Sequence, residues 1–303
     1  MPHRLTAVIC MAGVAAAVAG EPRVDHHQHL LSPAMAHTCG DIIDAARLIA
    51  ELDAAGIQRA VLLSNGYRDG DEFDKLRAEN DWTAAEAAKY PKRLTALCSV
   101  NPLDERAVEE IDRCAHGKQF GRGIKLQLGA NDVNLEDPQH VERLREVFRK
   151  ANDDRMALVI HLRTRRARAY GAAQAQLFID QILSAAPDVT VQVAHFTGGG
   201  NPDDKAADDA LAVLIDAIHR KDPRVKHLYF DTALVAPPGT APERREWVAQ
   251  RMREIGISHI LYGSDGGDPT DPPPKEQVDA FHLLPLTAGE FAAIEKNVAP
   301  YLR

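Results

Sequence analysis

The stretches "RVDHHQHL" at Arg23–Leu30 and "DIIDAARLIAELDAAG" at Asp41–Gly56 contain the repeating pattern from which the fold is predicted. The first segment is short and carries the β-branched Val24 followed by three histidines, which favours a buried strand. The second places apolar residues at helical spacing and stops at Gly56, as an amphipathic helix does. Together they predict one strand–helix unit.

The same unit recurs along the chain. We expect strands at Arg23–His29, Ala60–Ser64, Leu94–Val100, Gly123–Gln127, Ala157–Leu162, Val189–Phe196, Leu228–Leu234 and Ile260–Ser264. We expect the intervening helices at Glu72–Lys89, Leu103–Ala115, Pro138–Asn152, Ala172–Ala186, Asp203–Arg220 and Pro242–Ile255, with a closing helix at Thr287–Asn297 after a Pro/Gly-rich loop. Strict alternation implies a parallel sheet, and eight units predict an α/β fold, a single-domain (β/α)8 TIM barrel. A doubly wound open sheet is the rival, but no G-x-G-x-x-G follows an early strand.

Composition argues against a nucleic-acid partner. The chain of 303 residues is 45% hydrophobic and 26% charged, enough for a large core, with a net charge of −8. Its one basic run, "RTRRAR" at Arg163–Arg168, is too short to indicate a nucleic-acid partner.

Residues 1–20 differ from the remainder. They carry Arg4 and then an uncharged, alanine-rich stretch ending in small residues, which predicts a cleavable export signal. A start-site artefact or a frayed helix would give the same pattern. Cleavage leaves residues 21–303 as a mature domain, which we expect to be periplasmic or secreted and free of the membrane.

The cysteines predict no disulfide framework. Cys10 lies in the expected signal, and Cys39, Cys98 and Cys114 lack C-x-x-C spacing. Export would permit one disulfide, but the sequence does not select a pair.

Candidate site residues lie where the expected strands end, which is where barrel enzymes carry their active sites. His27 and His29 share one face of the first strand. His161 follows the fifth strand in register with Val159, and His195 follows the sixth in register with Val191 and Val193. Asp265 ends the eighth.

Lys125 on the fourth strand alternates with Ile124 and Leu126, so it points into the barrel. Reaction with carbon dioxide would convert it to an anionic carbamate able to bridge two metals. Four histidines and a carboxylate suit a divalent metal, with zinc favoured and manganese or iron(II) as alternatives. Such an ion lowers the pKa of bound water from 15.7 to about 7.

An ordered pattern of residues resembles the amidohydrolase superfamily. The pattern comprises D-x-H-x-H at Asp25–His29, single strand-end histidines at His161 and His195, and "YGSD" ending at Asp265. "GIKL", "AHFTGG" and the closing "NVAPYLR" are most similar to its amidohydrolase-2 (amidohydrolase-related) branch. The resemblance spans residues 22–303 and implies a (β/α)8 barrel with one or two metals.

The resemblance assigns roles. His27, His29 and Asp265 would bind the buried metal, and Asp265 would also act as the catalytic base. His161 and His195 would bind a second metal; with one ion, His161 would bind it and His195 would polarise the substrate. For Lys125 two roles remain open, a bridging carbamate or a plain lysine that contacts substrate or Asp265.

Four neighbouring residues have candidate roles outside the ligand set. Arg163 at the rim is a candidate clamp for a substrate carboxylate, with a solvated basic loop as the alternative. Asp25 would orient a ligand histidine or serve in a turn, and His26 would pack or cap. Asp231 ends the seventh strand and would touch substrate or make ordinary hydrogen bonds.

The predicted function is a metal-dependent hydrolase that adds water to an amide, lactone or ester-like bond of a small molecule. A non-oxidative decarboxylase of a carboxylate substrate is the first alternative. A catalytically inactive binding barrel is the second, although no expected ligand is missing. Barrels of this kind often pair, so a homodimer stays open.

Overall fold

The structure is a computed structural model that describes residues 20–39, 41–69, 72–165, 167–198, 204–267 and 271–303. The export signal expected at residues 1–20 lies outside these residues except for Gly20, so it stays a prediction. Among the described residues, no helix is both long enough and apolar enough to cross a membrane.

Eight parallel strands in the described chain pair in sequence order. They are β1 (Val24–Gln28), β2 (Arg59–Leu63), β3 (Leu94–Ser99), β4 (Gly123–Gln127), β5 (Ala157–His161), β6 (Val191–Val193), β7 (Leu228–Asp231) and β8 (Ile260–Leu261). The chain after β8 hydrogen-bonds to β1, from Asp265 N to His27 O (2.8 Å) and from His29 N to Gly266 O (2.8 Å). These bonds close the sheet, and the predicted (β/α)8 barrel is confirmed.

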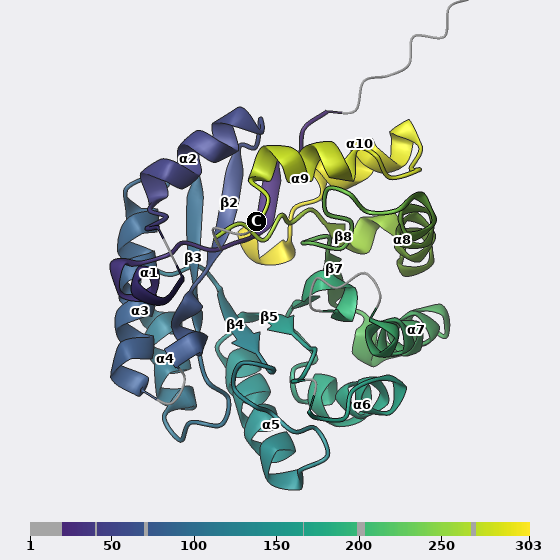
Figure 1. The fold of residues 1–303 in the computed structure, drawn as a ribbon. Helices are drawn as coiled ribbons and strands as arrows, with labels where there is room; N and C mark the ends of the chain where they lie inside the picture. The colour runs from purple at the N-terminus through teal and green to yellow at the C-terminus, as the bar shows by residue number, and fades with distance from the viewer. Residues whose placement is uncertain (1–19, 40, 70–71, 166, 199–203, 268–270) are drawn as a thin grey trace, which may run out of the picture.

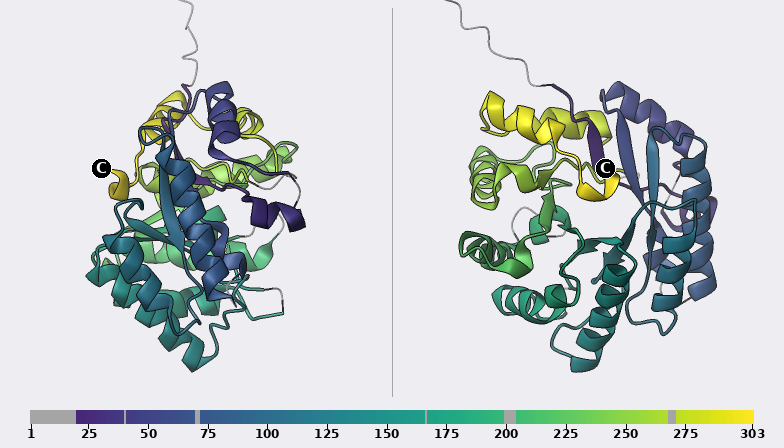
Figure 2. Two further views of the ribbon diagram at one scale, coloured as in Figure 1. Left: turned by 90° about the vertical axis from the view of Figure 1, so that its left-hand side faces the viewer. Right: turned by 180° about the vertical axis from the view of Figure 1, so that it is seen from behind.

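Helices surround the ring of strands (Figure 1). They are α1 (Pro33–Cys39), α2 (Ala45–Ala54), α3 (Phe73–Ala88), α4 (Ala107–His116), α5 (Pro138–Asp153), α6 (Ala172–Leu177), α7 (Lys205–His219), α8 (Pro242–Ile255), α9 (Pro274–Phe281) and α10 (Ala288–Lys296). α1 and its loop lie at one end of the barrel, whereas the C-terminal residues lie at the other (Figure 2, left).

Two helices were not expected from the sequence, and one prediction was wrong. α9 follows the Pro/Gly-rich loop, and Pro274 lies in the first turn of this helix, where a missing N–H costs nothing. α1 is a seven-residue helix that is too short to show periodicity. The helix expected over Ala172–Ala186 is broken into α6, a π turn at Phe178–Ile182 and a 3₁₀ turn at Leu183–Ala185.

The apolar core has two parts. A large outer part packs the helices against the outside of the sheet. A smaller inner part lies inside the barrel and consists of Val24, Val61, Leu63, Leu97 and Val159. The C-terminal residues Val298, Tyr301 and Leu302 pack against this inner part.

A disulfide joins Cys98 of β3 to Cys114 of α4. Both cysteines are buried. The structure thus selects the pair that the sequence left open, because β3 and the helix that follows it bring these two residues to a Cα–Cα distance of 6.4 Å.

Candidate metal centre

His27 and His29 lie together at the end of β1, at one cavity. Val24 faces the barrel interior, so strict alternation would turn Gln28 rather than His27 to the same face. The register of β1 against β2 shifts between Asp25 and Gln28, and this irregularity brings His27 into the interior.

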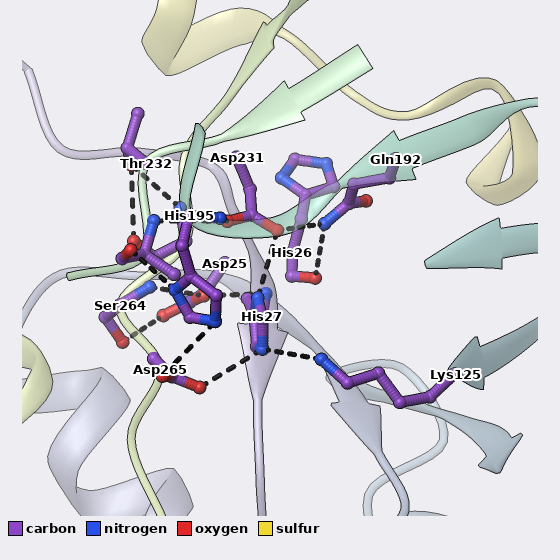
Figure 3. Close-up of polar contacts among 12 residues, drawn as sticks. Asp25, His26, His27, Lys125, Gln192, His195, Asp231, Thr232, Ser264 and Asp265 are labelled. Atoms are coloured by element: carbon purple, nitrogen blue, oxygen red, sulfur yellow. Dashed lines mark hydrogen bonds and ion pairs between the residues drawn. The ribbon is translucent and has the colours of Figure 1, made fainter. Parts of the chain in front are cut away.

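Asp265, in the chain that follows β8, contacts His27 and His195 (Figure 3). Its Oδ1 is 3.1 Å from Nε2 of His27 and 3.5 Å from Nε2 of His29. Its Oδ2 is 3.7 Å from Nε2 of His195. One carboxylate therefore contacts histidines from both β1 and the loop after β6.

His195 arrives by a route that the sequence analysis did not foresee. It was expected to share a face with Val191 and Val193, but those valines pack in the outer core. The φ angles of His195 and Phe196 are +54° and +49°, in the left-handed region, and this kink turns the imidazole into the cavity. Asp265 also has a positive φ, of 61°. Backbone strain of this kind is concentrated at functional sites.

The Nδ1 atoms of three histidines are held by acceptors. Nδ1 of His29 is 2.6 Å from the carbonyl of Leu63, and Nδ1 of His195 is 2.8 Å from that of Ala233. A carbonyl oxygen can only accept, so each Nδ1 carries the proton and each Nε2 keeps a lone pair. His27 places Nδ1 3.0 Å from Oδ2 of Asp231. Partners of this kind on the far nitrogen are typical of metal-binding histidines.

His161 and Lys125 complete the group. The His161 ring lies 4.9 Å from that of His195. Lys125 is only 1% exposed, and its Nζ is 3.2 Å from Nε2 of His27 (Figure 3). Burial lowers the pKa of Lys125 to about 8, which increases the fraction of neutral amine at neutral pH.

Burial also sets the charge of the other groups. It lowers the pKa of His29 to about 4 and lowers those of His161 and His195, so these imidazoles are neutral at pH 7. For Asp265, burial is outweighed by His27 and His195, and the pKa lies well below its usual range. Burial likewise opposes protonation of His27, but Asp231 and Asp265 raise its pKa to about 9 in the metal-free protein.

The group lines a cavity of about 180 Å³. The lining residues are His27, His29, Tyr67, Arg68, Lys125, Gln127, His161, His195, Leu234, Asp265, Gly267 and Asp271. The six residues named as metal ligands from the sequence are all among them. Arg68, which the sequence analysis missed, lies just after β2 in a short 3₁₀ turn, Asn65–Asp69. An arginine that soon follows a strand end was the available signal.

Arg163, the expected carboxylate clamp, is not one of these lining residues. Its Nε is 2.7 Å from Oδ2 of Asp204, and its guanidinium lies 4.8 Å from the centre of the Tyr170 ring. The structure therefore places it in an ion pair beside the site.

Asp25 and His26 hold the barrel closed beside the site. Asp25 accepts hydrogen bonds from the backbone of His27 and from Ser264, so it joins β1 to the chain after β8 without touching a ligand ring. His26 is buried, with Nδ1 3.0 Å from the carbonyl of Tyr262. Its expected packing role agrees with this position.

These donors fit a divalent metal. Ligand atoms of His27, His29 and Asp265 lie within 4.8 Å of one another. Imidazole nitrogens around a carboxylate are the donor set that zinc and manganese accept; His29 is already neutral, and a metal would displace the proton from His27. Burying so many polar groups is costly in a protein interior unless an ion or substrate compensates.

The sequence matches a known protein family over most of its length. The Amidohydro_2 family model, described as amidohydrolase, matches residues 24–297. The chain belongs to the amidohydrolase family. The matched region runs from β1, with the paired histidines, to the end of α10. A search of curated proteins finds no match.

Solved structures of other amidohydrolase-like proteins share the barrel. A 5-carboxyvanillate decarboxylase from Novosphingobium aromaticivorans, complexed with manganese, has a TM-score of 0.62 at 17% identity, covering 92% of this chain and 95% of the other. A probable 2-pyrone-4,6-dicarboxylic acid hydrolase from Acinetobacter baumannii, with citric acid bound, has a TM-score of 0.60 at 18% identity, covering 90% and 96%. An amidohydrolase from Burkholderia multivorans with bound zinc has a TM-score of 0.60 at 13% identity, covering 91% and 96%. At these identities the likeness shows the fold alone.

Proposed function

We propose that this protein is a metal-dependent hydrolase that cleaves an amide, lactone or ester-like bond of a small carboxylate-bearing molecule. The observation that carries the proposal is the position of Lys125. Its buried amine lies in the same cavity as four histidines and Asp265, where a hydrolase with two metals needs a bridging ligand.

The residues divide into two sets of ligands. His27, His29 and Asp265 would hold one metal; His161 and His195 would hold the second, with Lys125 as a carbamate bridge between them. When bound, the metal acidifies a water molecule and polarises the bond to be cleaved. Zinc suits the histidine-rich set, and structural neighbours contain zinc or manganese.

Asp265 is the base. The water oxygen forms a bond to the carbonyl carbon, and Asp265 takes the proton that the water loses. Asp265 then gives this proton to the leaving nitrogen or oxygen as its bond to carbon breaks. A carboxylate with its two oxygens facing different histidines is held in place for both transfers.

Arg68 supports an anionic substrate. It lines the cavity together with Gln127 and Tyr67, so a guanidinium and an amide share the cavity with the candidate ligands. A guanidinium binds a carboxylate through charge-assisted hydrogen bonds. We assign to Arg68 the substrate-clamping role first predicted for Arg163.

The same feature favours a second candidate, non-oxidative decarboxylation. An arginine orients a carboxylate equally well for loss of carbon dioxide, and several structural neighbours are decarboxylases of 5-carboxyvanillate or 2,6-dihydroxybenzoate. In that reaction a protonated group of the site would deliver a proton to the carbon that loses its carboxylate.

The first experiment measures metal content per chain in the wild type and in Lys125→Ala, purified and then loaded with zinc or manganese. Two ions in the wild type and at most one in the variant support the hydrolase. One ion in both proteins favours the decarboxylase and makes Lys125 a substrate residue. A panel of lactones, amides and aromatic acids, assayed for acid release and for carbon dioxide, then separates the reactions. No metal in either protein overturns the proposal.

We also propose that the protein is exported. The disulfide between Cys98 and Cys114 supports this location, because structural disulfides persist in oxidising compartments. Detection of a mature chain that starts near Glu21 in a periplasmic or culture fraction tests it; a full-length chain confined to the cytosol contradicts it.

A further inference from the structure

The C-terminal segment Val298–Leu302 lies at the end of the barrel opposite the cavity. Val298, Tyr301 and Leu302 pack against the inner apolar cluster, and the chain end lies away from α1 and its loop (Figure 2, left). Apolar packing would suffice to cover this end of the barrel.

The segment nevertheless makes two polar contacts inside the barrel. The backbone N–H of Ala299 donates to Nε2 of His26 at 3.1 Å. The hydroxyl of Tyr301 donates to Oε1 of Gln192 at 2.7 Å. Both acceptors belong to residues buried next to the metal centre, His26 on β1 and Gln192 on β6.

Gln192 connects this segment to the site. Its side chain is fully buried, a position where an apolar residue would cost less. Its Nε2 donates to Oδ2 of Asp231 at 2.7 Å and to the carbonyl of His26 at 3.3 Å (Figure 3). All polar atoms of the amide are thereby satisfied.

Asp231 is the last link. Its Oδ2 accepts from both Gln192 and Nδ1 of His27, while its Oδ1 accepts the backbone N–H of His195 at 3.0 Å. The carboxylate therefore holds one ligand by its ring and another by its backbone.

We propose that Tyr301 is a positioning residue of the metal centre, acting through Gln192 and Asp231 on His27. The inference rests on the proposed function, since it gives the C-terminal segment a part in metal binding. The Tyr301 hydroxyl fixes the Gln192 amide, which in turn fixes the carboxylate that orients the His27 ring. One chain of hydrogen bonds therefore joins the C-terminal segment to the metal centre at the opposite end of the barrel.

The test uses the full-length protein and two graded variants. Tyr301→Phe removes only the hydroxyl, and Gln192→Met removes the donor to Asp231 at similar volume. Two readouts are taken: the dissociation constant for Mn²⁺ or Zn²⁺ in competition with a chelator, and the NMR signal of the His27 Nδ1 proton in metal-free protein. Since loss of outer partners weakens metal binding 10–100-fold, we expect about 10-fold for Gln192→Met and about 3-fold for Tyr301→Phe.

Two controls isolate the hydroxyl. Leu302→Ala weakens the apolar packing of the same segment, and Tyr229→Phe removes a hydroxyl from a tyrosine whose ring stacks on His259. Both should leave the metal dissociation constant and the His27 signal unchanged, even where thermal stability falls.

The outcomes separate this inference from the proposed function. If Tyr301→Phe lowers stability but changes neither the metal affinity nor the His27 signal, the segment only covers the barrel and the inference is wrong. If the wild type binds no metal, the proposed function fails, while a shifted His27 signal in Tyr301→Phe still establishes the hydrogen-bond chain.

Discussion

At the carboxyl end of the strands the barrel interior holds four histidines, a lysine and an aspartate around a cavity. Towards the other end lies the inner apolar cluster of Val24, Val61, Leu63, Leu97 and Val159, packed on the C-terminal segment. Both ends are filled from the same strands. The apolar end gains free energy from burial, whereas the polar end costs free energy that a bound ion or substrate must offset. The comparison separates residues that stabilise the barrel from residues that perform chemistry.

The largest expected effect is at the polar end. Asp265→Asn keeps the shape of the side chain but cannot accept a proton, so we expect kcat to fall on the order of 10³-fold. The thermal stability of the metal-free protein should fall, because the lowered pKa of Asp265 means that His27 and His195 stabilise its charge in the folded state. Steady-state kinetics on an identified substrate and thermal unfolding measure the two effects. An unchanged kcat in Asp265→Asn would show that Asp265 is not the base, whereas a wild type that binds metal but turns over no substrate would favour the inactive binding barrel.

The next largest effect is expected at the apolar end, where a substitution should lower stability but leave activity nearly unchanged. Leu97 is fully buried in the inner cluster, so Leu97→Ala should lower the free energy of unfolding by about 3 kcal/mol. Its kcat at a temperature where it is folded should stay within about 2-fold of the wild type, because it does not line the cavity. Leu97→Met, which conserves volume, is the control and should cost less than about 1.5 kcal/mol. Denaturant unfolding checks both, and a large loss of kcat in folded Leu97→Ala would remove the distinction between the two ends.

The smallest expected effects are on KM and concern two arginines, Arg68 and Arg163. Arg68→Gln should raise KM for a carboxylate substrate about 10-fold with little change in kcat, because a charge-assisted hydrogen bond is lost. Arg163→Gln should change KM less than about 2-fold, because Arg163 is paired with Asp204 and does not line the cavity. The reverse order would return the clamping role to Arg163. Kinetics with the same substrate measure both.

Much of this architecture could be read from the sequence because it depends on local patterns. Alternating strand and helix periods predicted the barrel, and Ala157–Leu162 or Pro242–Ile255 were placed to within a residue. His161 and Lys125 followed correctly from alternation, since β4 and β5 pair in regular register. The family match agrees with the resemblance carried by His27, His29, His161, His195 and Asp265.

The positions of His27 and His195 depend on irregular backbone. His27 shares the barrel interior with Val24 because the register of β1 shifts, and His195 enters the cavity through left-handed residues rather than through strand alternation. Regular alternation of residues along a strand predicts neither a register shift nor left-handed residues.

Residue types at the strand ends were enough to predict the barrel, the candidate ligands and the family. The tertiary structure alone decided which far-apart groups meet: Arg68 rather than Arg163 at the cavity, Cys98 with Cys114, and Tyr301 with Asp231 through Gln192. The physical reason is that strand and helix periods are local properties of the chain. Contacts between residues 39 or 109 positions apart depend on how separate strands and the C-terminal segment pack together.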